Sequence, residues 1–264
     1  MTEYTQRFTC DHDGNFRAIE TFDGDCRLTA KTVYEYQYHL NARSGMEEPF
    51  RWHEKYRFIR EVLAITFHYD HGVLAGSYPP GRETVDVGME DVSTYLGHVC
   101  LCGAGGFRIA RLAVKLLRED GPPLEKGDFV LIGGRDHTVS DVIAYVLGCS
   151  RRKDMSRNQY FIDENVEDVR REYHYFIGYP LEKRAVHVIY RKHLLIGNEM
   201  MDRLWKVETG YEEDPSTVSR EEIDLYRETM LKMVKEVLKG RKEGLFELQP
   251  LKYDGFLSRL ERLR

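Results

Sequence analysis

The 264-residue sequence has no long apolar run and no excess of basic residues. No stretch approaches the roughly 18 to 20 apolar residues that a membrane-spanning helix needs. The first residues, Met1–Arg7, lack the apolar core of a signal peptide. The formal net charge of −5 argues against a general nucleic-acid binder, because such proteins concentrate Lys and Arg on one face. We therefore expect a cytoplasmic protein with neither a membrane nor a nucleic acid as partner.

Cysteine is also scarce, which indicates whether the protein is secreted and whether its thiols are free to react. A small secreted domain held together by disulfides would be shorter and much denser in cysteine. An odd, sparse set in a long chain is more typical of reduced thiols, which stay available for metal binding or redox chemistry. The five cysteines are Cys10, Cys26, Cys100, Cys102 and Cys149.

The remaining composition, 42% hydrophobic and 31% charged, is that of a globular protein long enough for one large domain or two modest ones. Three runs near the start alternate apolar and polar residues, which predicts a β-meander over Arg7–Cys10, Phe16–Phe22 and Val33–His39. A Gly- and Pro-rich break at Gly76–Gly81 follows. We therefore predict a β-rich N-terminal region over residues 1–86 and a second domain over residues 87–264.

The second domain mixes helical and strand patterns. An amphipathic stripe after residue 106 predicts one helix, and sequences resembling capping boxes at Thr138–Asp141 and Ser219–Glu222 predict the start of two others. Short apolar or alternating runs predict strands, and these are residues 128–132, 173–176 and 185–190. The pattern is typical of an α+β protein with a mixed sheet and packed helices.

Three residues with metal-binding or nucleophilic side chains alternate in the run Gly97–Gly103, directly before the first of these helices. At a spacing of two, His98, Cys100 and Cys102 share one face of a strand or turn. A thiol near a helix N-terminus has a lowered pKa because it interacts with the positive end of the helix dipole. Nitrogen and sulfur donors of this kind suit zinc or iron. The alternative is an enzyme in which Cys100 is the nucleophile and His98 its partner.

A closed zinc site needs about four ligands, and this turn offers at most three. The strongest candidate for a further ligand is His137, which follows the predicted strand 128–132. His68 and His71 are a second option. The structural alternative is that the cysteines are small core residues and that the histidines only form hydrogen bonds.

The glycines after the turn allow a different interpretation. Gly103, Gly105 and Gly106 imitate a dinucleotide-binding fingerprint, but Arg108 stands where that motif has its third glycine. A narrower expectation is that the glycine amides and Arg108 hold a small anionic ligand at the helix start. The basic run Arg151–Arg157 is either a solvated loop or a contact for an anionic partner.

Taken together, three segments resemble the FmdE family, the E-subunit proteins associated with formylmethanofuran dehydrogenase. These segments are Tyr95–Gly103 with its following helix, Asp141–Ser150 and Glu243–Leu248. The resemblance implies an α+β core, a homodimer and a site for zinc. It also implies an accessory role in molybdenum or tungsten one-carbon metabolism.

By position, the family's second histidine corresponds to His98 and its cysteine to Cys100. The family's first histidine is replaced by Leu96, and a second-site cysteine is replaced by Thr138. The implied site would therefore have to be rebuilt, with Cys102 and His137 as further ligands. Iron or haem, with a His or Cys axial ligand, is the alternative cofactor.

Overall fold

A computed structural model describes the strand backbones of residues 5–10, 16–22 and 28–33, and then residues 50–79, 81–136, 138–150, 158–166, 171–239 and 242–264. The chain divides into two compact units, Met1–Phe50 and Arg51–Arg264. Residues 51–86, which we grouped with the N-terminal region on sequence, thus belong to the larger unit.

The smaller unit contains the predicted meander. Its strands β1 (Thr5–Cys10), β2 (Phe16–Phe22) and β3 (Leu28–Val33) form an antiparallel sheet in chain order. The third strand lies earlier than the sequence pattern indicated, and residues 34–39 of that predicted strand lie outside the described residues.

A five-stranded sheet forms the centre of the larger unit, in the order β10-β9-β8-β6-β7. Strand β7 pairs parallel to β6, whereas the other neighbours pair antiparallel, so the predicted mixed sheet is confirmed. Both edges are short or interrupted, because β7 has three residues and β10 contains Pro250. The strands are β6 (Val130–Gly133), β7 (Tyr160–Ile162), β8 (Glu172–Tyr179), β9 (Arg184–Arg191) and β10 (Phe246–Leu251).

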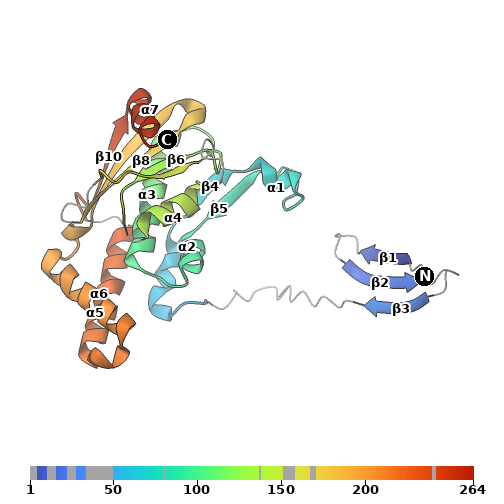
Figure 1. The fold of residues 1–264 in the computed structure, drawn as a ribbon, viewed down its shortest axis with the longest axis horizontal. Helices are drawn as coiled ribbons and strands as arrows, with labels where there is room; N and C mark the ends of the chain where they lie inside the picture. The colour runs from blue at the N-terminus through green and yellow to red at the C-terminus, as the bar shows by residue number, and fades with distance from the viewer. Residues whose placement is uncertain are drawn as a thin grey trace. The chain divides into compact units, whose positions relative to one another are not determined.

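Helices cover both faces of this sheet (Figure 1). On one face, Gly105 of α3 packs against the ring of Tyr190 in β9. On the other face, the ring of Phe256 in α7 lies over Gly178 in β8, within a cluster that includes Val130 and Ile132. Since successive strand residues point to opposite faces, this arrangement explains why β6 is apolar and buried along its whole length.

The remaining elements surround the sheet. An antiparallel hairpin of β4 (Ile65–His68) and β5 (Thr84–Val87) carries α1 (Asp70–Leu74). The α-helices are α2 (Met89–Leu96), α3 (Leu101–Arg118), α4 (Val139–Leu147), α5 (Asn198–Glu213), α6 (Arg220–Lys239) and α7 (Tyr253–Glu261), and short 3-10 helices span Glu54–Glu61, Pro180–Glu182, Lys192–Leu194 and Pro215–Thr217. Within the described part of the chain, none of these helices combines the length and apolar character needed to cross a membrane.

One of the two predicted helix caps is confirmed and the other is wrong. At the start of α6, the Glu222 amide donates to Ser219 Oγ, and the Ser219 amide donates to the Glu222 carboxylate. At the start of α4, Thr138 is the N-cap residue but its side chain forms no capping hydrogen bond. The Asp136 carboxylate instead accepts the amide of Ser140 at 3.1 Å and its hydroxyl at 2.7 Å.

Candidate functional site

The turn between α2 and α3 places Cys100 at the N-cap of an 18-residue helix. Helix α2 ends at Gly97, whose φ of 78° is in the left-handed region that glycine tolerates best. The chain then turns into α3, and the sulfur of Cys100 accepts a hydrogen bond from the amide of Gly103 at 3.3 Å. A cysteine sulfur therefore occupies the position where helices usually have a serine or aspartate oxygen.

Several interactions stabilise the thiolate form of Cys100. The largest is a hydrogen bond from the side chain of Cys102, and the amides of Gly103 and Cys102 add to it. Burial and the carboxylate of Glu208 act in the opposite direction. The balance lowers the pKa of Cys100 to about 7, so the nucleophilic thiolate is well populated at neutral pH.

The imidazole of His98 is held in a defined tautomer. Its Nδ1 lies 3.0 Å from the carbonyl oxygen of Leu96. A carbonyl can only accept, so Nδ1 carries the proton, and in the neutral ring Nε2 keeps the lone pair. His98 can therefore offer Nε2 as a base or as a ligand.

Both cysteines and His98 line one cavity of about 100 Å³. The opposite wall comes from α5 and α6, including Trp205 and Tyr226. A neighbouring cavity of about 310 Å³ shares His98, Glu208 and Tyr226 with it. The first cavity is lined by His98, Cys100, Leu101, Cys102, Thr138, Arg171, Lys192, Met201, Leu204, Trp205, Glu208, Tyr226, Met230 and Met233.

Charged side chains of both signs reach this cavity. Arg171 is neutralised by Asp202, 2.5 Å away, and also binds Asn198. Lys192 forms no ion pair with any residue that the structure describes. Glu208 accepts a hydrogen bond from Tyr226. Among the described residues that line the cavity, Lys192 is thus the cation with no ion pair.

Behind the cysteines lies a buried phenol with no hydrogen-bond partner among the described residues. The ring of Tyr190 is fully buried, and its hydroxyl is near the position that a Cβ on Gly105 would take, 3.5 Å away. Burial raises the pKa of Tyr190 well above its ordinary value, and negative charge on Cys102 and Cys100 raises it further. Tyr190 therefore stays a neutral hydroxyl beside the two sulfurs.

The glycines and Arg108 do not form the predicted anion cradle along this cavity. Gly105 and Gly106 lie inside α3, where they allow close packing against Tyr190 and Val142. Arg108 is half-buried, its Nε has no hydrogen-bond partner among the residues that the structure describes, and it does not line the cavity. The dinucleotide interpretation is wrong, because helix α2 rather than a strand precedes these glycines.

The metal-ligand prediction stays a prediction. Thr138, where the resemblance implies a second cysteine, lines the same cavity as His98 and Cys100. In the part of the chain that the structure describes, no three or more His, Cys, Asp or Glu side chains are grouped so that they could hold a metal ion. His137 lies outside the described residues, so the donors described here do not complete a zinc site.

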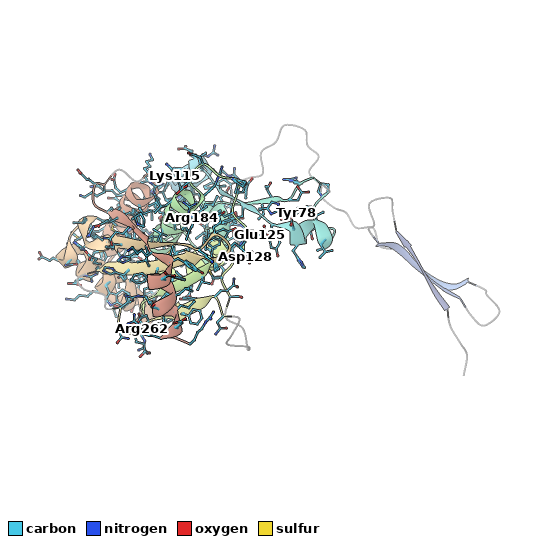
Figure 2. All side chains as sticks on the ribbon, turned by 90° about the horizontal axis from the view of Figure 1, so that it is seen from above. Tyr78, Lys115, Glu125, Asp128, Arg184 and Arg262 are labelled. Carbon is cyan, nitrogen blue, oxygen red and sulfur yellow. The ribbon has the colours of Figure 1, made fainter. Side chains whose placement is uncertain are left out.

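The other predicted contributors lie elsewhere or are not described. His68 binds Glu125 through Nδ1 at 2.5 Å and Asp70 through Nε2 at 3.2 Å, on the β4–β5 hairpin (Figure 2, where Glu125 is labelled). Neither His68 nor His71 lines the cysteine cavity. The basic run Arg151–Arg157 lies outside the described residues.

Sequence reasoning missed the wall formed by α5 and α6. Trp205, Glu208 and Tyr226 lie more than 100 positions beyond the cysteines, and no local pattern links them to the turn. The chain matches no protein-family model and no curated protein.

Proposed function

We propose that this protein acts through Cys100, which reacts as a thiolate with a small anionic substrate. The observation that carries the proposal is the position of the Cys100 sulfur, which caps α3 and faces a cavity that Lys192 also lines. A helix N-terminus and an ammonium group both attract negative charge.

Each polar group has a role in this proposal. Cys100 is the nucleophile, and the S–H of Cys102 stabilises its charge. His98 Nε2 is the group that can exchange a proton with the substrate, and Lys192 pairs with the anionic part of that substrate. The neighbouring cavity of about 310 Å³ gives room for the rest of the molecule, since ligand sites commonly measure roughly 300 to 1,000 Å³.

Two alkylating reagents that differ in charge test the proposal. Iodoacetate is anionic and iodoacetamide is neutral, so the ratio of their rates at Cys100 reports the local potential. We expect Cys100 to favour iodoacetate relative to a free thiol such as glutathione, and Lys192→Gln to reduce the ratio about threefold to tenfold. Lys206→Gln is the matched control, because Lys206 is exposed on α5 outside the cavity.

Two outcomes of the alkylation experiment would contradict the proposal. Equal ratios for wild type, Lys192→Gln and glutathione would show that the site has no anion preference. Labelling that persists in Cys100→Ser would show that the reactive group is a different cysteine.

Zinc binding is the second candidate, favoured by the convergence of His98, Cys100, Cys102 and Thr138 on one cavity. His137 would be the additional ligand. The resemblance to the FmdE family also implies a zinc site. Its further implications, a role in one-carbon metabolism and a homodimer, remain predictions. A haem is disfavoured, because a cavity of about 100 Å³ is far smaller than a cofactor pocket.

Metal analysis of purified protein separates this candidate from the first. Stoichiometric zinc that is lost in Cys100→Ser and protects Cys100 from alkylation would support a metal centre. A metal-free protein with rapid alkylation would support the thiolate.

A further inference from the structure

A second cavity, of about 300 Å³, lies on the outer face of α4. One side of that helix carries Asp141, Ala144 and Tyr145, which are neighbours on a helix surface because they are three or four positions apart. Tyr95 from α2, Tyr160 from β7 and Cys149 complete the lining. We call this hollow the tyrosine cavity.

Two of the tyrosines form a single aromatic wall. The rings of Tyr95 and Tyr145 stack with centroids 4.4 Å apart and planes 6° apart. Both are large exposed aromatic residues, at 50% and 38% of their full exposure. In this parallel stack each ring covers one face of the other, so one outer face of each ring remains for a ligand, and such faces carry partial negative charge.

The third tyrosine belongs to the other side of the hollow. The hydroxyl of Tyr160 donates to the Asp141 carboxylate, with 3.2 Å between oxygens. Ala144 is buried and short, so it leaves space between Tyr145 and Tyr160. Burial raises the pKa of both Tyr145 and Tyr160 above the ordinary value, which keeps these phenols neutral.

Among the described residues that line the tyrosine cavity, the charge is negative, while Lys126, whose Nζ lies 3.3 Å from the backbone carbonyl oxygen of Tyr145, does not line it. Asp141 is its charged residue, and no Lys, Arg or His among the described residues lines it. A further carboxylate, Asp91, is close enough to Tyr145 to raise its pKa. The Asp141 carboxylate disfavours an anionic ligand here and favours a cation over a neutral ligand of the same shape.

We propose that the tyrosine cavity binds a quaternary or methylated ammonium cation, with its methyl groups on the tyrosine faces and its charge opposite Asp141. Aromatic faces with a nearby carboxylate are the chemistry that recognises choline-like headgroups and methylated lysine, because the poorly hydrated cation gains from both. The site is separate from the cysteine cavity, and this proposal does not depend on the proposed function.

The test compares choline with 3,3-dimethyl-1-butanol, a neutral molecule of the same shape, by calorimetric titration of the full chain. We expect saturable binding of choline and at least about tenfold weaker binding of the neutral analogue. A trimethyl-lysine peptide is titrated in parallel. Tighter binding of the peptide than of choline would identify a methylated polypeptide as the source of the cation, and the reverse would identify a small molecule.

Variants locate the binding site. Asp141→Asn and Tyr145→Ala should each weaken choline binding by about tenfold, while Asp224→Asn, at an exposed position on α6, should leave it unchanged. Unchanged melting temperatures exclude loss of folding as the cause. Equal affinity for choline and its neutral analogue, no saturable binding of either cation, or unchanged binding by Asp141→Asn would each overturn the proposal.

Discussion

The amide of Gly103 lies 3.3 Å from the sulfur of Cys100, so the first turn of α3 binds a thiolate through its backbone. Cys102, two residues along the same turn, donates from its side chain to the same sulfur. The reactivity of Cys100 therefore depends on a short segment of backbone and on one neighbouring side chain.

The first prediction concerns pH. Because the pKa of Cys100 is lowered to about 7, its alkylation rate should rise through pH 7 and level off above pH 8. Cys102→Ala removes the main stabilising donor, so the midpoint should move to higher pH. Mass spectrometry of iodoacetamide-treated protein between pH 5 and 10 measures both curves. Cys149, whose pKa burial raises to about 12, should stay unlabelled, and an unchanged midpoint in Cys102→Ala would refute this account.

The second prediction tests the close packing of α3 on α4. A Cβ on Gly106 would lie 2.7 Å from Val142 Cβ and 2.8 Å from the carbonyl oxygen of Val139. Gly106→Ala should therefore destabilise the fold by about 1 to 3 kcal/mol in urea unfolding. Gly255→Ala on α7, which has no neighbour within 4 Å, should be neutral or stabilising by about 0.4 to 1 kcal/mol. Equal effects of the two substitutions would contradict the packing described.

The third prediction concerns the start of α4. The Asp136 carboxylate binds the amide and hydroxyl of Ser140 and the buried hydroxyl of Tyr175, 2.9 Å away. Asp136→Ala would leave the helix uncapped and a buried phenol unpaired, which should lower the free energy of unfolding by about 2 to 4 kcal/mol. Thr138→Ala should have a smaller effect, since its side chain forms no capping hydrogen bond. A larger loss in Thr138→Ala would restore the capping box expected from sequence.

The fourth prediction is a pH-dependent contribution from His68. Its hydrogen bond to Glu125 raises its pKa above the ordinary 6.5, and the charges of Asp70 and Glu125 add to this. Folding thus favours the protonated ring, so its contribution is complete below about pH 6.5 and is lost as the pH rises through the raised pKa. His68→Gln should destabilise the protein more at pH 5.5 than at pH 8.5 in thermal unfolding. His71→Gln is the control, and an equal deficit for His68→Gln at both pH values would exclude the ion pair as the cause.

The sequence predicted elements whose signal is local. The strand predicted over Phe16–Phe22, the Ser219 cap with Glu222 and the amphipathic stripe of α3 all appear in the structure. These features depend on neighbours within about four positions, which a single sequence contains. The α+β class follows from them.

Features that depend on long-range contacts were missed. The cap of α4 comes from Asp136, because that carboxylate also serves Tyr175 from β8. Gly105 also depends on a distant residue, because it packs against the ring of Tyr190, 85 positions away. Without knowledge of that contact, the sequence pattern around Gly105 resembles an anion-binding glycine loop. The sequence placed a turn directly before α3, and Cys100 does cap that helix, whereas the facing wall at Trp205 and Tyr226 required the fold.

The two edges of the central sheet have a consequence for association between copies of the chain. Strand β7 offers three residues, and β10 places Pro250, which has no amide hydrogen, opposite Val186. Exposed strand edges otherwise recruit strands from other molecules and seed aggregates. This sheet is thus poorly suited to grow into a continuous intermolecular sheet, and we expect no contact between copies of the chain along its two edges.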